Sequence, residues 1–462
     1  MSRVDVLIVG AGPAGMAAAI VARRHGLEVT VIDDQPEPGG QIWRSIETAR
    51  RRDPVLGPSY VEGRAVAEAF RASGAIYQAS AQLWQIEPGF RAFVSRGRQA
   101  HVIEAKTVIL ATGAQERPIP FPGWTLPGVL TVGAAQILLK NAGQIPAGPV
   151  WIAGSGPLPL LYAVQLLRAG GGIAGYLDTT PPGQWRAALP HLPAALRAWS
   201  HLLKGLGWTL RLRMSATPVI AGVMEIEALG SDRIRALRYR TTGGAVATVP
   251  TDTLLVHEGV VPNLHAPLSL DCAVAWNPAQ DCYAPVVDPW GESSCENLFI
   301  AGDSAGIAGG RPAQLRGELS ALAVAVKVGR MSDAAATAAA RPIRRGLERE
   351  LALRPFLDAL FKPRPQVFAP SDGTIVCRCE EITAGEIRAL ASVGCPGPNQ
   401  IKATTRAGMG PCQGRQCGYT VTRILATAQD RSPAEVGFFH IRPPLKPVTL
   451  GELASLDPHP GA

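Results

Sequence analysis

The N-terminal part of the chain alternates between apolar runs and glycine-rich or polar breaks. Residues 4–9 form an apolar run that is followed at once by a glycine-rich turn. A short apolar run bounded by a turn is typical of a buried strand. An alanine-rich segment at 16–25 then predicts a helix, and residues 28–32 predict a second strand. This order predicts a βαβ unit in a parallel sheet.

The same order recurs in the middle of the chain. An apolar run begins at Val150, a glycine-containing turn and a helix follow, and a strand over 173–177 ends at Asp178. A later apolar strand, 297–301, runs into a glycine-rich loop and a helix predicted over 313–328. Two βαβ units far apart in one chain indicate two nucleotide-binding domains of one fold class.

Beyond residue 330 the composition changes twice, first to an alanine-rich and charged helical stretch, then to a proline-rich segment at 362–370. Such a segment indicates a domain boundary. The predicted fold is α/β, with two Rossmann-like dinucleotide-binding domains and a small C-terminal α-rich domain. The predicted boundaries are 1–130 with 265–330 for the first domain, 131–264 for the second, 331–370 for a helical linker, 371–430 for the α-rich domain and 431–462 for an extended tail.

The first glycine-rich turn has the spacing of a dinucleotide-binding fingerprint. Gly10 is expected to make the tight turn, Gly12 to let a pyrophosphate approach, and Gly15 to let the helix pack on the strand. Asp33 ends the second strand at about the ~20-residue interval at which an acid binds the ribose hydroxyls. This unit of strand, turn, helix and strand, with the acid at its end, therefore predicts that the domain binds a dinucleotide.

Composition narrows the class of protein. With 462 residues, the chain is long enough for roughly two to four domains. The net charge is +8, but the basic residues are scattered and not interleaved with aromatic residues, which favours a solvated surface or a docking face for an acidic partner over nucleic-acid binding. No uncharged apolar run reaches the ~18 residues of a membrane span. The first strand begins too early for a signal peptide, and the cysteine pattern is typical of the reducing cytoplasm.

Four cysteines near the C-terminus carry the second candidate chemistry. Cys377 and Cys379 form one close pair, and Cys412 and Cys417 form another. Thiolates are soft ligands that select Fe–S clusters or zinc. The second pair lies in a glycine-rich turn, 408–414, whose backbone N–H groups can be directed at sulfur. The spacing predicts a metal centre, either [2Fe–2S] or zinc.

The first fingerprint, the Gly39-Gly40-Gln41 segment, Ala111-Thr112-Gly113 and Ala301-Gly302-Asp303 together resemble the two-dinucleotide-domain flavoproteins. The resemblance implies that the first domain binds FAD and that Asp303 binds its ribityl and phosphate region. It also implies that a helix opening near Gln314 directs its positive end at the flavin ring. The implied FAD residues are Gly10, Gly12, Pro13, Ala14, Gly15, Asp33, Asp34, Gly40, Gln41, Arg44, Leu83, Ala111, Thr112, Gly113, Gly302, Asp303 and Gln314.

Residues 39–44, residues 257–263, the cysteine module and the Arg442-Pro-Pro tail carry a narrower resemblance. They are similar to the FAD-binding larger-type subunits of hetero-oligomeric amino-acid and opine dehydrogenases. That group includes the FAD-binding subunits of opine oxidase, of D-hydroxyproline or proline dehydrogenase and of hydrogen cyanide synthase, together with part of the α subunit of sarcosine oxidase.

This narrower resemblance implies further cofactors and partners. The cysteine module resembles the [2Fe–2S] domain related to bacterioferritin-associated ferredoxin. The companion implied is a β subunit of D-amino-acid-oxidase-like fold that carries the substrate site. A small third subunit, an FMN at an interface between subunits and an external electron acceptor are further implied. No catalytic acid or base of this chain is nominated.

The second fingerprint departs from the family pattern. It reads Gly154-x-Gly156-x-x-Pro159, with proline where the third glycine is expected, although Asp178 is still available for a ribose. The fold of the domain is expected to persist, while NAD, ATP or no nucleotide remain as alternatives. A functional NADH site would instead indicate a stand-alone NAD(P)H-dependent reductase, and a chain without flavin would indicate a redox-sensing scaffold.

Overall fold

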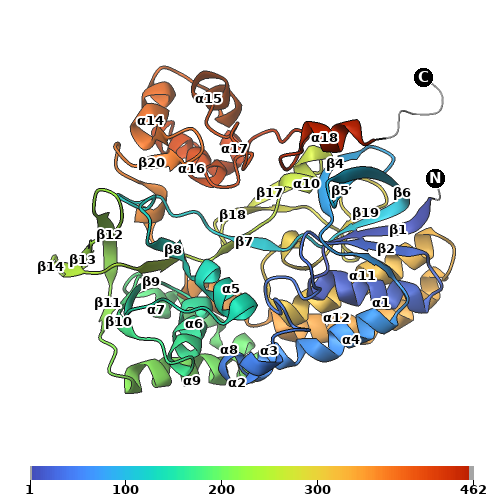
Figure 1. Cartoon of the computed structure of the whole chain (residues 1–462), viewed down its shortest axis with the longest axis horizontal. Helices are drawn as coiled ribbons and strands as arrows, with labels where there is room; N and C mark the ends of the chain where they lie inside the picture. Colours follow the sequence, from blue (N-terminus) through green and yellow to red (C-terminus); the bar gives the residue numbers. More distant parts are fainter. Residues whose placement is uncertain (1–2, 457–462) are drawn as a thin grey trace.

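Two parallel sheets organise the computed structural model, which describes residues 3–456 (Figure 1). The first sheet has the order β3-β2-β1-β6, and β19 pairs with the far side of β6. All these pairs are parallel. The N-terminal half of β6 continues into an antiparallel extension with β5 and β4. The bounds are β1 Val4–Val9, β2 Val29–Ile32, β3 Ile76–Gln78, β4 Gln82–Glu87, β5 Arg91–Arg96, β6 Gln99–Leu110 and β19 Leu298–Ile300.

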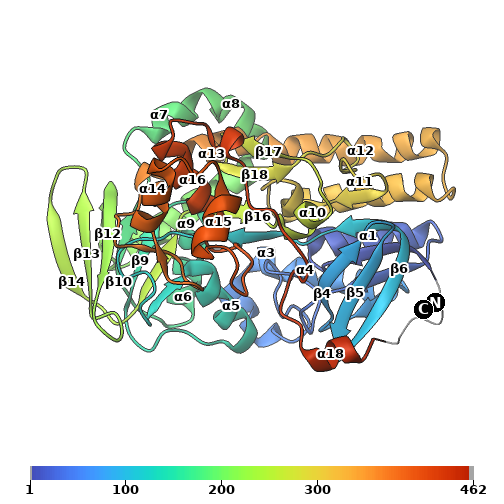
Figure 2. The same cartoon turned by 90° about the horizontal axis from the view of Figure 1, so that it is seen from above.

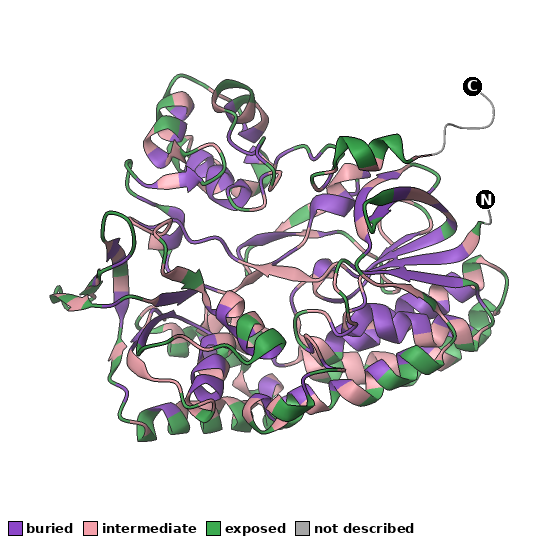
Figure 3. Ribbon diagram, viewed as in Figure 1, coloured by how far each residue is buried: buried purple, intermediate pink, exposed green. Residues whose placement is uncertain are grey.

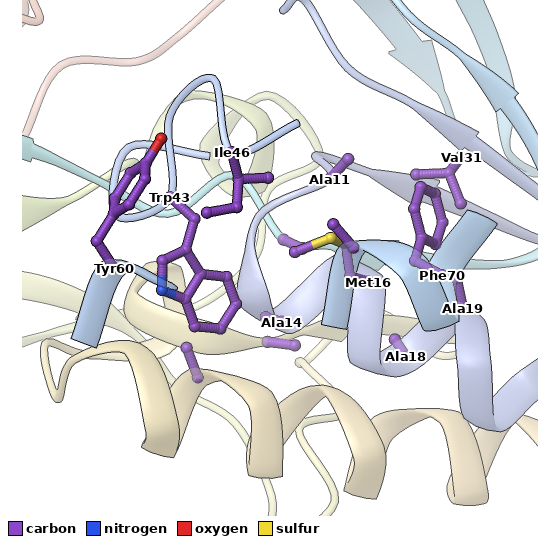
Figure 4. Packing of buried hydrophobic residues seen from close by; sticks show 14 of the residues in the cluster. Ala11, Ala14, Met16, Ala18, Ala19, Val31, Trp43, Ile46, Tyr60 and Phe70 are labelled. Carbon is purple, nitrogen blue, oxygen red and sulfur yellow. The ribbon is translucent and has the colours of Figure 1, made fainter. Parts of the chain in front are cut away.

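Helices cover one face of this sheet in two layers. Gly317 lies where α11 crosses α1 so closely that a Cβ there would lie 2.1 Å from the Ala14 carbonyl oxygen. Figure 4 shows the core beside this crossing, where Trp43 and Ile46 pack close to Ala14. The helices of this face are α1 Pro13–Arg24, α4 Gly63–Ala72, α11 Gly310–Lys327 and α12 Asp333–Leu351.

The second sheet has the order β11-β10-β9-β15-β8 and is also parallel throughout. A separate three-stranded antiparallel sheet, β12-β13-β14, and the short pair β7–β16 complete this part. The bounds are β7 Ala114–Glu116, β8 Val129–Thr131, β9 Val150–Gly154, β10 Ile173–Asp178, β11 Val219–Ala221, β12 Val223–Leu229, β13 Ala236–Thr241, β14 Val246–Pro250, β15 Leu254–His257 and β16 Val260–Pro262, with helices α5 Val132–Ala142, α6 Pro157–Arg168, α7 Gln184–Ala188, α8 Leu192–Ala195 and α9 Trp199–Met214.

The cysteine module is a small, mostly helical unit seated over the junction of the two sheets (Figures 1 and 2). The Trp124 indole N–H donates to the Ile375 carbonyl oxygen at 2.6 Å, which attaches the start of the module to the body. Its elements are β20 Ile375–Cys377, β21 Ile382–Thr383, α14 Ala384–Ser392, α15 Pro398–Thr405 and α16 Gly418–Ala428.

Further short elements belong to the body of the protein. They are α2 Asp53–Leu56, α3 Pro58–Val61, α10 His265–Ser269, β17 Val274–Asn277, β18 Cys282–Pro285 and α13 Arg354–Leu360.

The segment predicted as a helical linker is helical and packed. α12 buries Ala336 and Ala340 against the body of the protein. In the proline-rich part, Val367 and Phe368 are buried in the same apolar cluster as β12. Arg364 is also buried and pairs with Glu258 at 2.8 Å. The segment 331–370 therefore joins the module to the second sheet through buried contacts.

The prediction of an extended tail over 431–462 is wrong at two places. α17, Pro433–Val436, and α18, Leu450–Ala454, are short helices, and each begins with a capping box. Ser432 with Glu435, and Thr449 with Glu452, satisfy the free N–H groups of these helix starts. The tail between them lies along β4, where the Leu445 N–H donates to the Trp84 carbonyl oxygen at 2.6 Å. Residues 457–462 of the predicted tail lie outside the described residues.

Burial follows the two-sheet plan, with the strands and the inner helix faces buried and the outer helix faces exposed (Figure 3). Among residues 3–456, no helix is both long enough and apolar enough to cross a membrane.

Candidate cofactor-binding site

A cavity of about 1180 Å³ opens at the carboxyl ends of β1, β2 and β6. This edge of a parallel sheet is where doubly wound folds bind their ligands. The volume exceeds the range of drug-sized pockets, which suits an extended ligand. The predicted FAD residues that line it are Gly10, Gly12, Pro13, Ala14, Asp33, Asp34, Gly40, Gln41, Leu83, Ala111, Thr112, Gly113, Gly302 and Asp303.

Close backbone packing explains the glycines of the first turn. A Cβ at Gly15 would lie 1.8 Å from the Gly10 carbonyl oxygen, so only glycine lets α1 approach β1 this closely. Gly10 has φ +102° and no room for a Cβ beside Ala111. A Cβ at Gly40 would lie 2.9 Å from the Gly12 Cα, which brings the second glycine segment against the first turn. The two segments form a cradle of bare backbone.

Asp33 closes the turn from the end of β2. Its carboxylate accepts the Ala11 N–H and, at 2.7 Å, the Gln35 N–H. Burial raises the pKa of Asp33 to about 6, against the lowering effect of these two hydrogen bonds. The acid is therefore held at the cavity wall by backbone donors, where it can meet a hydroxyl.

The neighbouring carboxylates are fixed by the tail and by a loop. Asp34 pairs with Lys446, and although burial raises the pKa of Asp34, this lysine lowers it on balance. Lys446 also lines the cavity, so the tail contributes to its wall. Asp303 accepts the backbone N–H groups of Ala308 and Gly309 at 2.9 Å each. That loop leads directly into α11.

Three predicted FAD residues do not line the cavity. Gly15 lies in the first turn of α1 against the Gly10 carbonyl, Gln314 accepts a hydrogen bond from Arg311 at 2.9 Å, and Arg44 donates to Asn141 at 3.2 Å. A second guanidinium nitrogen of Arg44, Nη1, is buried without a partner, as is the Thr112 hydroxyl oxygen. Buried polar atoms without partners are costly, so the residues fit a ligand rich in phosphate and hydroxyl groups.

A buried polar chain that the sequence did not reveal crosses the cavity wall. Lys140 of α5 donates to the Gln41 carbonyl oxygen at 2.9 Å and to the Gln136 side chain at 2.8 Å. Gln136 in turn donates to Gln165 of α6 at 2.8 Å, and Gln165 donates to the Leu56 carbonyl oxygen. Burial lowers the pKa of Lys140 to about 7, and Arg44 adds to the effect. In the sequence these residues are only polar positions of amphipathic helices.

The four predicted ligand cysteines lie together as two interacting pairs. Cys417 interacts directly with Cys377, and this contact, against burial, lowers the pKa of Cys377 to about 6. Backbone N–H groups, including that of Gly408, also donate to Cys377. Cys379 and Cys412 form the second interacting pair. Within residues 3–456, no group of three or more Cys, His, Asp or Glu side chains is arranged to hold a metal ion.

Aromatic rings and glycines shape the cysteine loops. Cβ atoms at Gly408 and Gly414 would lie 2.8 and 2.7 Å from the Phe439 ring. A Cβ at Gly410 would lie 2.2 Å from the Cys379 Cβ. The loop over residues 408–417 is therefore enclosed between Phe439 and Cys379, which explains its glycine content.

Two hydrogen bonds hold the second cysteine loop against the cavity. Gln115 of β7 donates to the Arg415 carbonyl oxygen at 2.9 Å. His265 of α10 donates to the Gln413 carbonyl oxygen at 2.8 Å, and burial together with Arg415 lowers the pKa of His265 to about 3, which keeps the ring neutral. The module residues that line the same cavity as the first fingerprint are Arg378, Cys379, Arg415 and Gln416.

The second predicted nucleotide turn has a different geometry. Gly156 has φ +101° and faces open space, and Pro159 is buried in the first turn of α6. A Cβ at Gly154 would lie 2.4 Å from the His257 carbonyl oxygen. Asp178 accepts the Thr180 N–H of its own turn, at 2.9 Å. Gly154, Gly156, Pro159 and Asp178 are all absent from the lining of the large cavity.

Two family models match the chain. Residues 4–329 match the pyridine nucleotide-disulphide oxidoreductase model, which covers both sheets. Residues 373–456 match the sarcosine oxidase A3 domain, which covers the cysteine module and the tail.

Curated relatives match over nearly the whole chain. The A-type subunit of opine oxidase from Rhizobium meliloti is 44% identical, with 98% of this chain and 88% of the relative covered. The HcnB subunit of hydrogen cyanide synthase from Pseudomonas protegens is 32% identical, with 98% and 97% covered. The alpha subunit of sarcosine oxidase from Rhizobium meliloti is 25% identical, and the chain spans 42% of it.

Solved structures have the same fold. The crystal structure of L-proline dehydrogenase from P. horikoshii has a TM-score of 0.72 at 19% identity, with 98% of this chain and 79% of that chain covered. A thioredoxin reductase of Lactococcus lactis has a TM-score of 0.52 at 17% identity and covers 71% of this chain. The α/β fold is thus shared with oxidoreductases that match the whole chain and with others that match only its larger part.

Proposed function

The chain belongs to the pyridine nucleotide-disulphide oxidoreductase family and is an FAD-dependent oxidoreductase subunit, and from this we propose that it is the electron-transfer subunit of a hetero-oligomeric enzyme that oxidises the C–N bond of an amino, imino or opine acid. In this proposal it receives electrons from a companion subunit, then passes them through FAD and a [2Fe–2S] cluster to an external acceptor. Bound FAD accepts two electrons together, whereas a cluster passes them singly.

The first fingerprint supports FAD as the resident dinucleotide. The cradle of Gly10, Gly12 and Gly40 leaves backbone N–H groups and the start of α1 free to meet a pyrophosphate. The Asp33 carboxylate and the unpartnered Thr112 hydroxyl, both from residues that line the cavity, support binding of ribose hydroxyls and of a further polar group of the ligand. The finer fold assignment, two Rossmann-like domains, is supported by the two parallel sheets.

The arrangement of the four cysteine thiols in two pairs supports a two-iron cluster rather than zinc. A structural zinc ion gathers four ligands around one metal, whereas [2Fe–2S] distributes four thiolates over two irons. The cysteines interact as two pairs, Cys377 with Cys417 and Cys379 with Cys412. Within the first pair the pKa of Cys377 is lowered and that of Cys417 is raised, so the thiolate, which is the ligand form, is favoured at Cys377. We therefore assign the pairs to two irons of one cluster.

The observation that carries the proposal is the shared cavity. Cys379 and the first fingerprint line one continuous space, although they lie more than three hundred residues apart in the chain. Gln115 and His265 hold the second cysteine loop beside that space. This shared cavity supports the proposal that electrons pass between the two cofactors.

The remaining parts of the proposal concern partners and the second nucleotide. The companion proposed is a D-amino-acid-oxidase-like FAD β subunit that holds the substrate, with a small third subunit and an FMN at the interface as further components. The second turn, with Gly154, Gly156 and Asp178, is proposed to hold NAD, ATP or no nucleotide, without a role in hydride transfer. A cytoplasmic location is proposed because four of the eight cysteines must stay reduced as ligands.

The experiment is ligand removal by substitution. Cys412→Ser is expected to abolish bound iron and the visible cluster bands while the FAD content stays unchanged, because FAD contacts other elements. Cys395→Ser is the matched control, since Cys395 lies outside the two pairs, and it should retain both cofactors. Metal analysis and absorbance of the anaerobically purified chain measure the outcome. Zinc instead of iron, or loss of FAD together with iron, would contradict the assignment.

A further inference from the structure

An exposed apolar stripe runs along α9. Trp199, Leu203, Leu206, Leu210 and Met214 are 54–77% exposed. Their spacing of three and four residues places them on one face of the helix. Figure 3 shows the outer face of α9, at the lower edge of the molecule, as exposed. The opposite face packs inward, for example through the buried Leu212.

Three more large apolar side chains before α9 are also exposed. Trp185 of α7, Leu189 and Leu196 are 47–56% exposed. Isolated exposed apolar residues are ordinary, but a stripe of large side chains along one face of a helix marks an interaction surface. We call the five residues of this stripe, Trp199, Leu203, Leu206, Leu210 and Met214, the α9 patch.

The charge around the α9 patch has a single sign. Residues 184–214 contain no aspartate or glutamate. On the helical wheel, Arg211 flanks the stripe on one side and Arg213 on the other. Glu350 of α12 is bound to His201 at 2.9 Å on the inner flank. The five basic residues of this segment are Arg186, Arg197, Lys204, Arg211 and Arg213.

We propose that the α9 patch docks on an anionic membrane surface, with α9 lying in the plane of the lipid headgroups. Helices that bind in this way combine a tryptophan- and leucine-rich face with lysine and arginine beside it. The anionic headgroups of the cytoplasmic leaflet attract such cations, and the apolar side chains enter the headgroup boundary.

Two other occupants fit the charge pattern less well. A second copy of the chain would meet the patch with the same patch, which places the basic residues of both copies together. A protein partner would have to match these cations with acids of its own, without any reciprocal ion pair from residues 184–214, which contain no acid. A layer of anionic headgroups is complementary to all five basic residues of this segment.

Docking at this face has a consequence for the cofactor site. Lys204 and Trp208 of α9 line the large cavity from the other side of the helix. One wall of the cavity would therefore rest at headgroup level. The Lys204 ammonium also donates to the Ser59 hydroxyl at 3.1 Å, which connects α9 to the first sheet's helical layer.

The test is vesicle flotation of the full, FAD-loaded chain. The probes are phosphatidylcholine vesicles with and without phosphatidylglycerol. The chain is expected to float with the anionic vesicles, and added salt is expected to weaken this binding because it screens the cations. Leu206→Glu and Leu210→Glu should each weaken binding at least about tenfold, since each replaces an inserted leucine with an anion. Leu450→Glu, at an exposed leucine of α18, is the matched control and should bind normally.

Three outcomes would overturn the proposal. The first is a wild-type chain that floats with neither vesicle. The second is equal binding by the α9 variants and the wild-type chain. The third is unchanged vesicle binding while the α9 variants change the mass of the protein in solution or lose a co-purified subunit, which would assign the patch to a protein interface. FAD content and circular dichroism of the variants, expected to match the wild type, show that a loss of flotation comes from the surface.

Discussion

The two parallel sheets of this chain carry very different residues at the carboxyl ends of their strands. In the first sheet, β6 ends beside β1 in Ala111, Thr112 and Gly113, which are small residues that line the cavity. In the second sheet, the strand that corresponds to β6 is β15, and it ends beside β9 in His257 and Glu258, which are buried and charged or polar. The end of β6 thus borders the large cavity through small residues, whereas the end of β15 carries side chains that pair within the protein.

The polar groups at these edges also have different partners. In the first half, Asp33 reaches across to the glycine turn and accepts the Ala11 N–H. In the second half, Ser155 occupies the position of Ala11, but its N–H donates to the His257 carbonyl oxygen at 3.1 Å. His257 and Glu258 then pair with Glu116 and Arg364.

The two strand ends differ in what surrounds their polar groups. The first half has backbone packed too closely for any side chain around its glycine turn, and this turn lines the large cavity. In the second half, His257 and Glu258 pair with other protein side chains, although one carboxylate oxygen of Glu258 and the Thr179 hydroxyl have no partner. Pro159 is therefore accompanied by protein contacts at the neighbouring strand end, which is why we propose no hydride-transfer role for this half.

The largest expected effect is on the buried charges of the second half. Arg364→Met removes the partner of Glu258, whose second carboxylate oxygen already lacks a hydrogen bond. Leaving a buried carboxylate unpaired should lower the free energy of unfolding by about 3–5 kcal/mol. Chemical denaturation measures this loss in the free energy of unfolding. Arg240→Met, at the exposed pair with Glu225, should cost only about 0–1 kcal/mol. Equal costs for both would contradict the contrast between the two halves.

A smaller but more specific effect is expected at the first turn. Gly15→Ala places a Cβ where the Gly10 carbonyl oxygen lies, so α1 must move away from β1 at a cost of about 1–3 kcal/mol. The variant should lose most of its bound FAD. Gly156→Ala, in the open second turn, should keep the FAD content of the wild type despite its positive φ. The ratio of flavin to protein absorbance measures the bound FAD of each variant. Equal loss of flavin in both variants would contradict the proposed difference between the two glycine turns.

The smallest effect concerns Lys140, where the two halves meet. Its folded pKa is about 7, below the ordinary value of 10.5, so at intermediate pH the unfolded chain binds one proton more than the folded chain. The stability of the nucleotide-free chain should therefore rise with pH above about 7, by at most about 1.4 kcal/mol per pH unit. Lys140→Met should remove this rise, whereas Lys362→Met, outside the cavity wall, should keep it. Denaturation midpoints across that pH range measure both, and parallel curves for Lys140→Met and the wild type would contradict the assigned pKa.

Local sequence signals predicted the elements of the site well. The strand predicted over residues 4–9 corresponds to β1. The helix predicted over 313–328 corresponds to α11, which begins three residues earlier. Glycine spacing and the acid at a strand end are short-range properties, so one βαβ unit contains all of them. The tail helices also had such signals, Ser432 with Glu435 and Thr449 with Glu452, but the proline content of the whole tail outweighed them in the prediction.

Long-range neighbours could not be predicted in the same way. The contacts of the cysteine loop with Gln115 and His265 join residues 300 and 148 positions apart. Lys140 and Gln165 lie on helices of the second half, yet they bond to Gln41 and Leu56 of the first. Such polar residues look like solvent-facing helix positions in the sequence, and only the packing of the two halves buries them.

The most direct test of the central claim is anaerobic absorbance of the isolated chain before and after NADH is added. We expect bands of bound FAD and of [2Fe–2S] that NADH does not bleach at a catalytic rate, because the strand end of the second sheet is occupied by the Glu258–Arg364 ion pair. Rapid bleaching of the flavin by NADH would contradict this expectation and would make the chain a stand-alone reductase.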